Sequence, residues 1–381
     1  MAQYSRREIA CMSRHILITG GAGFIGSHLA DALLRRGCDV RVLDSLVSQV
    51  HGEHHPDYLD PNVELFHGDL RDSATVHRAL RGVDAVYHFA AAVGVGQSMY
   101  EIQTYTSINS VGTAVLLEAL TAQPVEKLIV ASSMSVYGEG LYLGSDGSAR
   151  IVVERSLEQL KRCAWEFTGS DGAPLEPVAT PETKPPSLSS VYALTKYDQE
   201  CLCLMVGRAY RIPTIALRFF NVYGPRQALS NPYTGVLAIF ASRYLNGKAP
   251  LIFEDGNQRR DFVSVHDVVQ ACLLSLDATE MSERIFNVGS GAGYTVRELA
   301  ERMARALGKE DIAPQISGKY RVGDIRHCFA DISLARAYLG YIPRVGLEDG
   351  IVELAAWLDG RTATDRVERA SAELAQRGLT L

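Results

Sequence analysis

The sequence predicts an α/β fold in which a doubly wound parallel sheet carries a smaller C-terminal lobe. Short β-branched, apolar runs alternate with helical patterns through the first two-thirds of the chain. These runs are continuously apolar, as strands buried on both faces of a sheet must be. A glycine-rich turn joins the first run to the first helical pattern. The length of 381 residues suits a large domain with a smaller lobe attached.

Six strands and four longer helices are expected in the first 220 residues. The expected strands are His15–Thr19, Asp39–Leu43, Val63–His67, Ala85–Phe89, Lys127–Ser132 and Thr214–Phe219. The helical patterns between them are Ile25–Arg36, Ser73–Leu80, Thr104–Leu120 and Tyr192–Tyr210.

The expected domain boundaries follow from where this alternation breaks. Residues 14–220 should form the main domain, interrupted at about 139–186 by a Gly- and Pro-rich insertion with a short helix around Val153–Phe167, anchored by Trp165 and Phe167. Residues 221–359 should form mainly the lobe and return in part to the main domain. Residues 360–381 are predicted to be a polar, helical tail that frays, and residues 1–13 a loose extension.

Composition excludes several classes of protein. A net charge of −6 argues against a nucleic-acid partner. No run of about 18 apolar residues could span a bilayer, and the first residues lack an apolar signal core, so we expect a cytoplasmic protein with no membrane partner. The seven cysteines lack metal-ligand spacing, so we expect no metal and thiols in a reducing compartment.

The glycine-rich turn is the most informative motif. In Ile16-Leu-Ile-Thr-Gly-Gly-Ala-Gly-Phe-Ile-Gly26 an apolar strand runs into three spaced glycines and then a helix. Gly20 permits a tight turn, Gly23 lets the backbone approach a pyrophosphate, and Gly26 lets helix and strand pack closely. Phe24 and Ile25 open the helix, whose N-terminus favours an anion. This arrangement predicts a Rossmann-type dinucleotide site.

Carboxylates after the next strands select the dinucleotide. Asp44 ends the second expected strand, where an acid accepts ribose hydroxyls and repels a 2′-phosphate, which favours NAD over NADP. An N-cap role would predict the same residue type. Arg41 should point away by strand alternation. Asp69, followed by Leu70, offers a carboxylate to the adenine amino group, although a turn residue is nearly as good a reading.

A tyrosine and a lysine four residues apart suggest proton chemistry. Tyr192 and Lys196 lie on one helix face, and Ser133 ends a strand that can meet them across the nicotinamide. A free phenol, with a pKa of about 10, is a poor base at neutral pH. A nearby ammonium and the oxidised nicotinamide both stabilise the phenolate. One positive charge about 4 Å away contributes roughly 4 kcal/mol, or about three pKa units, so we expect the pKa of the phenol to fall near 7.

From about Arg14 to Asp359 the chain resembles the extended short-chain dehydrogenase/reductases that act on nucleotide sugars. The resemblance rests on the motifs above, on Asn109 in Asn-Ser-Val-Gly-Thr, and on Phe220–Arg226, Asp255–Val263 and Arg321–Asp324. It implies a Rossmann-type fold, an NAD cofactor and a nucleotide-sugar substrate. It also implies NAD contacts from Ala90, Ala91 and Asn109, and substrate contacts from Ser133, Asn221, Arg226, Arg260, Arg321 and Asp324.

The residues after Ser133 indicate which reaction the resemblance implies. Sugar dehydratases of this family carry an Asp-Glu pair there, and the decarboxylases a Glu, whereas this chain has Met134 and Ser135. Without these acids we expect a 4-epimerase that oxidises C4, lets the 4-keto sugar rotate and reduces it again. A 4-ketosugar reductase or a non-catalytic, NAD-sensing regulator are the alternatives. A reductase would usually prefer NADPH, and a regulator would not need Ser133, Tyr192 and Lys196.

A narrower resemblance concerns the sugar. Ala92–Tyr100, the insertion and Arg226–Gly235 are similar to bacterial dTDP-L-rhamnose 4-epimerases, which implies conversion of dTDP-L-rhamnose to dTDP-6-deoxy-L-talose. A UDP-hexose substrate stays open. So does the role of the insertion, as a lid over the sugar or a surface embellishment. The resemblance also implies a homodimer, built through the helices at Thr104–Leu120 and Tyr192–Tyr210.

Overall fold

The computed structural model describes residues 14–52, 56–228, 235–278, 284–321, 323–359 and 367–380. The expected N-terminal extension lies outside these residues, as do residues 360–366 of the tail.

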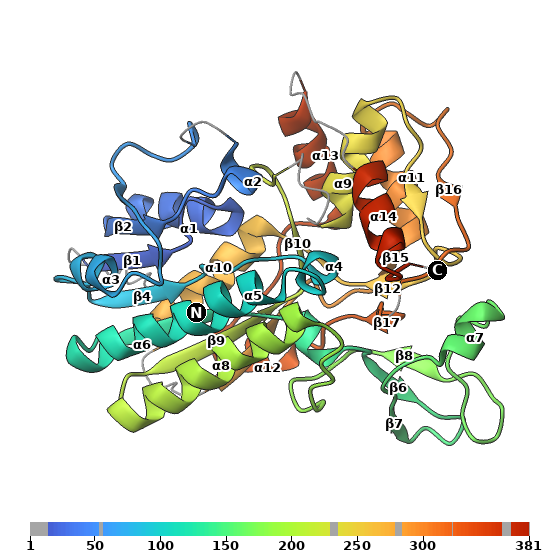
Figure 1. The fold of residues 1–381 in the computed structure, drawn as a ribbon, viewed down its shortest axis with the longest axis horizontal. Coiled ribbons are helices and arrows are strands. Elements are labelled where there is room, and N and C mark those ends of the chain that lie inside the picture. The colour runs from blue at the N-terminus through green and yellow to red at the C-terminus, as the bar shows by residue number, and fades with distance from the viewer. Residues whose placement is uncertain are drawn as a thin grey trace, which may run out of the picture.

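A parallel sheet of seven strands forms the centre of the molecule, in the order β14-β9-β5-β4-β1-β2-β3 (Figure 1). Its strands are β1 His15–Thr19, β2 Asp39–Asp44, β3 Glu64–His67, β4 Ala85–His88, β5 Lys127–Ser133, β9 Thr214–Phe219 and β14 Arg284–Val288. The first six of these strands were predicted from the sequence to within one residue at each end. The structure confirms the predicted α/β fold class. The strand β14, which pairs with β9 and brings the chain back to the sheet, was not predicted from the sequence.

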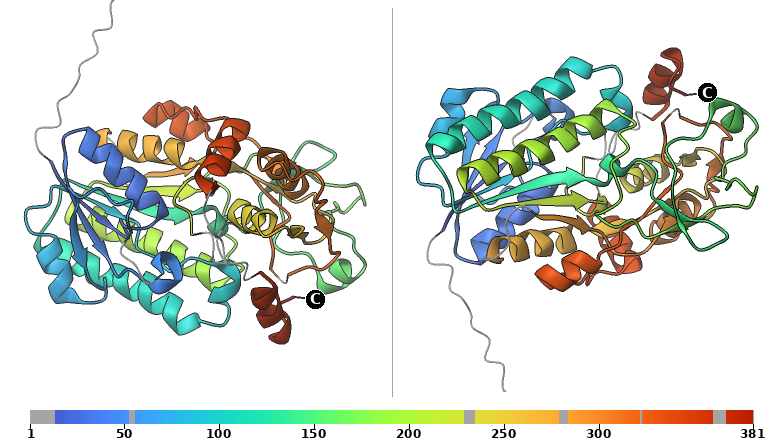
Figure 2. Two further views of the ribbon diagram at one scale, coloured as in Figure 1. Left: turned by 90° about the horizontal axis from the view of Figure 1, so that it is seen from above. Right: turned by 90° about the horizontal axis from the view of Figure 1, so that it is seen from below.

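Helices cover both faces of the sheet, as Figure 2 shows. One face is covered by α1 Phe24–Arg35, α10 Val265–Asp277 and α12 Ser333–Leu339, and the other by α3 Ser73–Ala79, α6 Gly112–Ala122 and α8 Val191–Tyr210. Successive residues of β1 divide between the two layers: Ile16 and Ile18 pack in one core cluster and Leu17 in the other. Burial on both faces therefore explains the unbroken apolar strands.

The helix expected at Thr104–Leu120 is interrupted. It consists of α5 Ile102–Tyr105, a π-helical segment at Thr106–Val111, and α6. Asn109 is fully buried within the π-helical segment, a kind of distortion that is frequent at functional sites.

The insertion folds differently from the expectation. Its strands β6 Leu141–Leu143, β7 Ala149–Ile151 and β8 Glu176–Val178 make a small antiparallel sheet. The helix expected over Val153–Phe167 is wrong in length, because α7 covers only Leu157–Lys161 and the chain turns at Cys163 with a φ of +56°. Phe167 does act as an anchor, since it packs on Tyr142 in a core of its own.

The C-terminal lobe has a separate apolar core and three small sheets. These pair β10 Asn221–Tyr223 with β13 Phe262–Ser264, β11 Leu251–Ile252 with β16 Gln315–Ile316, and β12 Arg259–Arg260 with β15 Tyr294–Thr295 and β17 His327–Cys328. The core forms between α9 Val236–Leu245, α11 Val296–Ala306 and α13 Leu347–Leu358.

The described part of the tail is packed against both halves of the molecule. In α14 Val367–Gln376, Leu374 is buried and Glu368 pairs with Arg243 of α9. A Cβ added to Gly96, in α4 Val95–Ser98, would lie 3.4 Å from Leu374. Beyond the helix, Thr380 makes a β-bridge with Arg321. This segment thus joins α4 of the main domain to the lobe, which the polar composition of the tail did not predict.

Candidate active site

The predicted site residues gather where the parallel strands end. Gly20 follows β1, Asp44 ends β2 and Ser133 ends β5, so all three lie at the carboxyl edge of one sheet. This is where ligands bind in open α/β sheets.

The glycine turn has the tight backbone geometry that a dinucleotide requires. Gly20 has a φ of +70°, and a Cβ there would lie 2.8 Å from the Ala90 backbone. A Cβ on Gly26 would lie 2.6 Å from the Cα of Gly21, and one on Gly23 would crowd the Gly20 carbonyl at 3.3 Å. The chain then enters α1 at Phe24, with Ile25 half-buried against the core. Glycine at these positions and a helix N-terminus directly behind them fit a pyrophosphate.

Asp44 supports the same turn. Its carboxylate accepts hydrogen bonds from the backbone N–H groups of Ala22, at 3.1 Å, and Leu46, at 2.9 Å. It does not cap the following helix, since Val47 precedes α2 Ser48–His51. A carboxylate has about four lone-pair sites, so two remain for ribose hydroxyls. Arg41 points away as expected, toward Glu64.

The other predicted cofactor residues differ in which of their atoms are accessible to a cofactor. Asp69 already forms an ion pair with Arg71 at 2.5 Å. The Leu70 side chain lies in the core against Gly112, which leaves only its backbone for a ligand. Ala90 packs under the glycine turn, and Ala91 beside it is half-buried.

Asn109 organises the neighbouring loop. Its side chain accepts from the Ala92 N–H at 2.7 Å, and donates to the Ala92 carbonyl at 3.1 Å and to Thr195 Oγ1 at 2.9 Å. These bonds connect the π-helical segment to the loop after β4 and to α8. In the structure Asn109 therefore positions other groups.

Tyr192, at the start of α8, and Ser133, at the end of β5, come together in the structure. Ser190 caps α8 by accepting from Ala193 N–H, and this cap starts the helix just before Tyr192. The Tyr192 backbone N–H donates to Ser98 Oγ at 3.0 Å, and its ring packs edge-on against Tyr105. Burial raises the pKa of Tyr192, and a hydrogen bond with the Ser133 side chain opposes that rise.

The expected lowering of the Tyr192 pKa by Lys196 and the oxidised nicotinamide stays a prediction. Among the protein's own groups, burial has the largest effect and holds the pKa of the phenol above its usual value. Lys196 Nζ donates to Gln199 Oε1 at 2.7 Å. Burial lowers the pKa of Lys196 itself to about 8.

Sequence reasoning missed three buried polar residues beneath the site. Gln199 follows Lys196 by one helical turn, and it contacts Thr113 and His88. All three are fully buried. The sequence signals were the spacing of Gln199 from Lys196 and the place of Thr113 at the end of the motif that begins at Asn109, whereas His88 gave none.

Four predicted substrate residues belong to the lobe. Arg260 donates to the carbonyl oxygens of Arg259, Ile325 and Arg326, and lies 3.9 Å from the Asp324 carboxylate. Arg321 stacks on the Phe253 ring at 4.3 Å, and its Nε is buried without a hydrogen-bond partner in the described part of the chain. Asn221 is half-buried and donates to the Asp261 carbonyl. The group offers guanidinium donors suited to a diphosphate.

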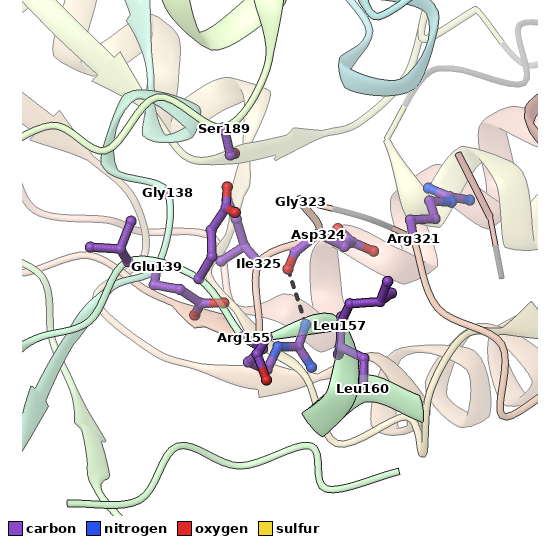
Figure 3. A pocket seen from close by; sticks show the side chains of 13 residues that line it. Gly138, Glu139, Arg155, Leu157, Leu160, Ser189, Arg321, Gly323, Asp324 and Ile325 are labelled. Carbon is purple, nitrogen blue, oxygen red and sulfur yellow. Dashed lines mark hydrogen bonds between the residues drawn. The ribbon is translucent and has the colours of Figure 1, made fainter. Parts of the chain in front are cut away.

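The insertion forms one wall of a cavity beside these residues, shown in Figure 3. The cavity measures about 340 Å³. From the insertion come Arg155, Leu157 and Leu160, and from the lobe Arg321 and Asp324. Ser189 and Gly138, close in sequence to the catalytic candidates, also line it.

Buried charges fix that wall in place. Arg155 makes two hydrogen bonds to Glu254, at 2.8 and 2.9 Å. It makes a third to the Asp324 carbonyl at 3.0 Å, which Figure 3 shows as a dashed line. Arg326 also bonds Glu254, and its side chain is fully buried. Glu139 accepts from the backbone N–H groups of Arg326 and His327. The insertion is therefore joined to the lobe by a buried ion pair, Arg155–Glu254, and by hydrogen bonds from backbone N–H groups to Glu139.

Arg226 is not placed with the other substrate candidates. It pairs with Asp31 of α1 at 2.8 Å and stacks on the Tyr58 ring at 5.4 Å. It lines a different groove, with His28 and His266. Substrate binding by Arg226 stays a prediction: the left-handed backbone at Arg226, φ +67°, turns its side chain to α1.

Two general features complete the description. None of the described helices has the length and apolar character needed to cross a membrane. Among the described residues, His, Cys, Asp and Glu side chains form no group of three or more that could hold a metal ion.

Known proteins share this architecture and sequence. The family described as NAD dependent epimerase/dehydratase matches residues 16–289. The dTDP-L-rhamnose 4-epimerase of Burkholderia thailandensis is 36% identical over 350 residues, 91% of this chain and 95% of that protein. Two solved UDP-glucose 4-epimerases are similar in structure. The Thermotoga maritima enzyme with UDP-glucose has a TM-score of 0.75 at 32% identity, covering 91% of this chain and 98% of that one. The Thermus thermophilus enzyme with NAD has a TM-score of 0.72 at 33% identity, covering 91% and 100%.

The fold and the glycine turn define a Rossmann-type enzyme that uses NAD. The chain belongs to the NAD-dependent epimerase/dehydratase family. The expectation of an NAD-dependent nucleotide-sugar epimerase is thereby confirmed, and so is NAD as its cofactor.

Proposed function

We propose that this protein is a 4-epimerase of a dTDP-6-deoxy-L-hexose, converting dTDP-L-rhamnose to dTDP-6-deoxy-L-talose. One observation supports this type of reaction. The site contains the buried Tyr192 and Ser133, but the residues that follow Ser133 in the sequence, Met134 and Ser135, have no carboxyl group. The nearby Glu139 is occupied by backbone N–H groups and by the Tyr142 hydroxyl. The site thus holds what oxidation at C4 needs and lacks the carboxylate that elimination of water would use.

Each side chain has a defined task in this reaction. NAD, when bound, supplies the oxidation and reduction at C4. Tyr192 takes the proton of the 4-hydroxyl, and returns it to the 4-oxygen once the keto sugar has turned and presents the opposite face of C4 for reduction. Ser133 hydrogen-bonds the 4-oxygen and keeps the phenol aligned. Lys196 binds the nicotinamide ribose, and its charge adds to that of the oxidised nicotinamide in stabilising the phenolate.

The remaining candidate residues bind the dinucleotide and the diphosphate of the sugar nucleotide. Gly20, Gly23, Gly26 and Asp44 bind the dinucleotide, with Asn109 positioning the loop beside it. Arg260 and Arg321 bind the diphosphate of the sugar nucleotide, supported by Asp324 and Asn221. The unpartnered Nε of Arg321 supports this assignment, because a buried donor without an acceptor is costly unless a ligand provides one.

The choice of sugar rests on the relative and on one loop. The similar Burkholderia thailandensis protein is a dTDP-L-rhamnose 4-epimerase. In the loop after β4, Val93 is 57% exposed and Val95 43% exposed. Exposed aliphatic groups there would suit the methyl group of a 6-deoxy sugar.

A UDP-hexose is the second candidate substrate. Both similar solved structures are UDP-glucose 4-epimerases, one of them bound to UDP-glucose. Proton NMR of the purified protein with dTDP-L-rhamnose and no added cofactor separates the two. Appearance of the C4 epimer would support the proposal. Turnover of UDP-glucose or UDP-galactose alone would instead identify a UDP-hexose as the substrate. No turnover of any of them, even with NAD added, would contradict both.

We further propose a homodimer formed through the face that carries α6 and α8. Val111, Leu194 and Met205 are each at least half exposed on the π-helical segment and α8. Large apolar side chains on neighbouring helices are typical of an interface. Sedimentation equilibrium should give twice the mass of 41.6 kDa, and a Met205→Asp variant should sediment as a monomer.

A further inference from the structure

We propose that Gln199 is a positioning residue of this active site: it holds the Lys196 ammonium and ties it to a buried polar chain through Thr113 and His88. This inference rests on the proposed role of Lys196, and it goes beyond it by explaining what fixes the lysine.

The contact between the two residues is direct. Lys196 Nζ donates to Gln199 Oε1 at 2.7 Å, across one turn of α8. The Gln199 side chain is fully buried, and Lys196 is 3% exposed. A buried ammonium needs an acceptor, because an unpaired charge away from water is costly.

Neighbouring groups fix the orientation of the Gln199 amide. Its Nε2 donates to Thr113 Oγ1 at 2.9 Å and lies 3.3 Å from the Ala90 carbonyl. If the amide turned over, its NH₂ group would face the Lys196 ammonium and its oxygen would face the Ala90 oxygen. Both contacts would be repulsive. The amide therefore has one orientation, and it presents its oxygen to Lys196.

His88 continues the chain of polar groups. Its Nε2 lies 3.0 Å from Gln199 Nε2 and 2.8 Å from Thr113 Oγ1, and its Nδ1 lies 2.8 Å from Thr19 Oγ1. Burial lowers the pKa of His88 to about 3, so the ring is neutral near pH 7 and adds no second positive charge. The chain thus connects Lys196 to Thr19, directly before the glycine turn.

A neutral acceptor sets the protonation of Lys196. The other titratable groups facing it are Cys203, Glu200 and His88. Glu200 is occupied by Arg218 and Ser132, both within 2.9 Å. Because Gln199 brings no negative charge, burial prevails and the pKa of Lys196 falls to about 8.

Two substitutions of similar size should move Lys196 in opposite directions. In Gln199→Met the ammonium loses its acceptor, so its pKa should fall by about one unit or more. In Gln199→Glu a carboxylate replaces the amide oxygen, so the pKa of Lys196 should rise above its value in the unchanged protein. Asn287→Leu is a matched control, because it removes a fully buried amide in β14 that bonds Tyr137, Thr180 and Asp331.

The measurement is a pH titration of the full-length protein by NMR, with ¹³C at the lysine Cε. The chain has seven lysines, and a Lys196→Met variant assigns the resonance. Copurified NAD and thermal stability are measured on the same samples. We expect opposite shifts of the Lys196 pKa in the two Gln199 variants and none in Asn287→Leu.

An unchanged Lys196 pKa in both Gln199 variants would overturn the proposal and make Gln199 a core residue only. If Gln199→Met fails to fold, an unshifted or lowered pKa in Gln199→Glu overturns it equally. The titration needs no sugar nucleotide. An incorrect substrate assignment would therefore leave this test unaffected.

Discussion

Replacing Arg155 tests whether the insertion is a fixed wall of the substrate site. Arg155 and Glu254 have side chains only 2% and 1% exposed. Removing one partner of such a buried pair costs about 3–5 kcal/mol, because the other charge is left uncompensated. Glu254 keeps its bond to Arg326 at 2.9 Å, so for Arg155→Met we expect the lower end, about 3 kcal/mol.

The same change should weaken binding of the sugar nucleotide. Arg155 also donates to the Asp324 carbonyl, and loss of a charged hydrogen bond would free the loop beside Arg321. We expect KM to rise about tenfold with little change in kcat, since the reacting groups are untouched.

Urea unfolding followed by tryptophan fluorescence measures the stability effect. Only Trp165 and Trp357 are present, so a Trp357→Phe background reports on the insertion alone. Arg150→Met is the matched control: its ion pair with Asp146 is exposed, and its loss should cost less than about 1 kcal/mol. If Arg155→Met unfolds at the same urea concentration as the control and keeps its KM, the buried pair does not hold the insertion.

Four further predictions concern single parts of the site. Tyr192→Phe should lower kcat by about 10²–10⁴-fold while copurified NAD is unchanged; substantial activity would exclude Tyr192 as the base. Asp44→Asn should reduce copurified NAD about tenfold or more, because one of its two backbone N–H donors would face an NH₂ group; full NAD content would contradict the role of Asp44. Arg226→Ala should lower the free energy of unfolding by about 1 kcal/mol and leave KM within about twofold, whereas a large rise in KM would return Arg226 to the substrate site. Deleting residues 367–381 should raise KM about 2- to 10-fold, since Arg321 would lose its bridge to Thr380 and have to be ordered by the substrate; an unchanged KM would make α14 irrelevant to binding.

The sequence was most informative where local pattern and tertiary environment agree. The strands of the sheet are buried on both faces, so a strand such as β1 can be recognised in the sequence as an unbroken apolar run. The glycine turn was equally predictable, because the positive φ of Gly20 and the close approach at Gly26 can be met by few other residues.

Elements that depend on distant partners were not predictable. The three-residue strands of the insertion pair across Gly- and Pro-rich loops, and their periodicity is too short to read. The direction of Arg226 depends on Asp31, 195 positions away in the chain. The hydrogen bond from Lys196 to Gln199 likewise depends on residues of other elements, because Thr113 bonds the Gln199 amide.

The two ends of the site meet opposite demands of epimerisation. The keto sugar must turn over, so its ring cannot be held by many directed bonds, whereas the nucleotide must stay bound through the turn. The diphosphate candidates are accordingly rigid: Arg260 is held by three backbone carbonyls, and the loop at Asp324 is held by the buried Arg155. Exposed valines in the loop proposed to face the sugar could give only non-directional contact. Freedom at the sugar therefore depends on rigidity at the diphosphate. For this reason a change at Arg155, far from the reacting atoms, should act on KM while one at Tyr192 acts on kcat.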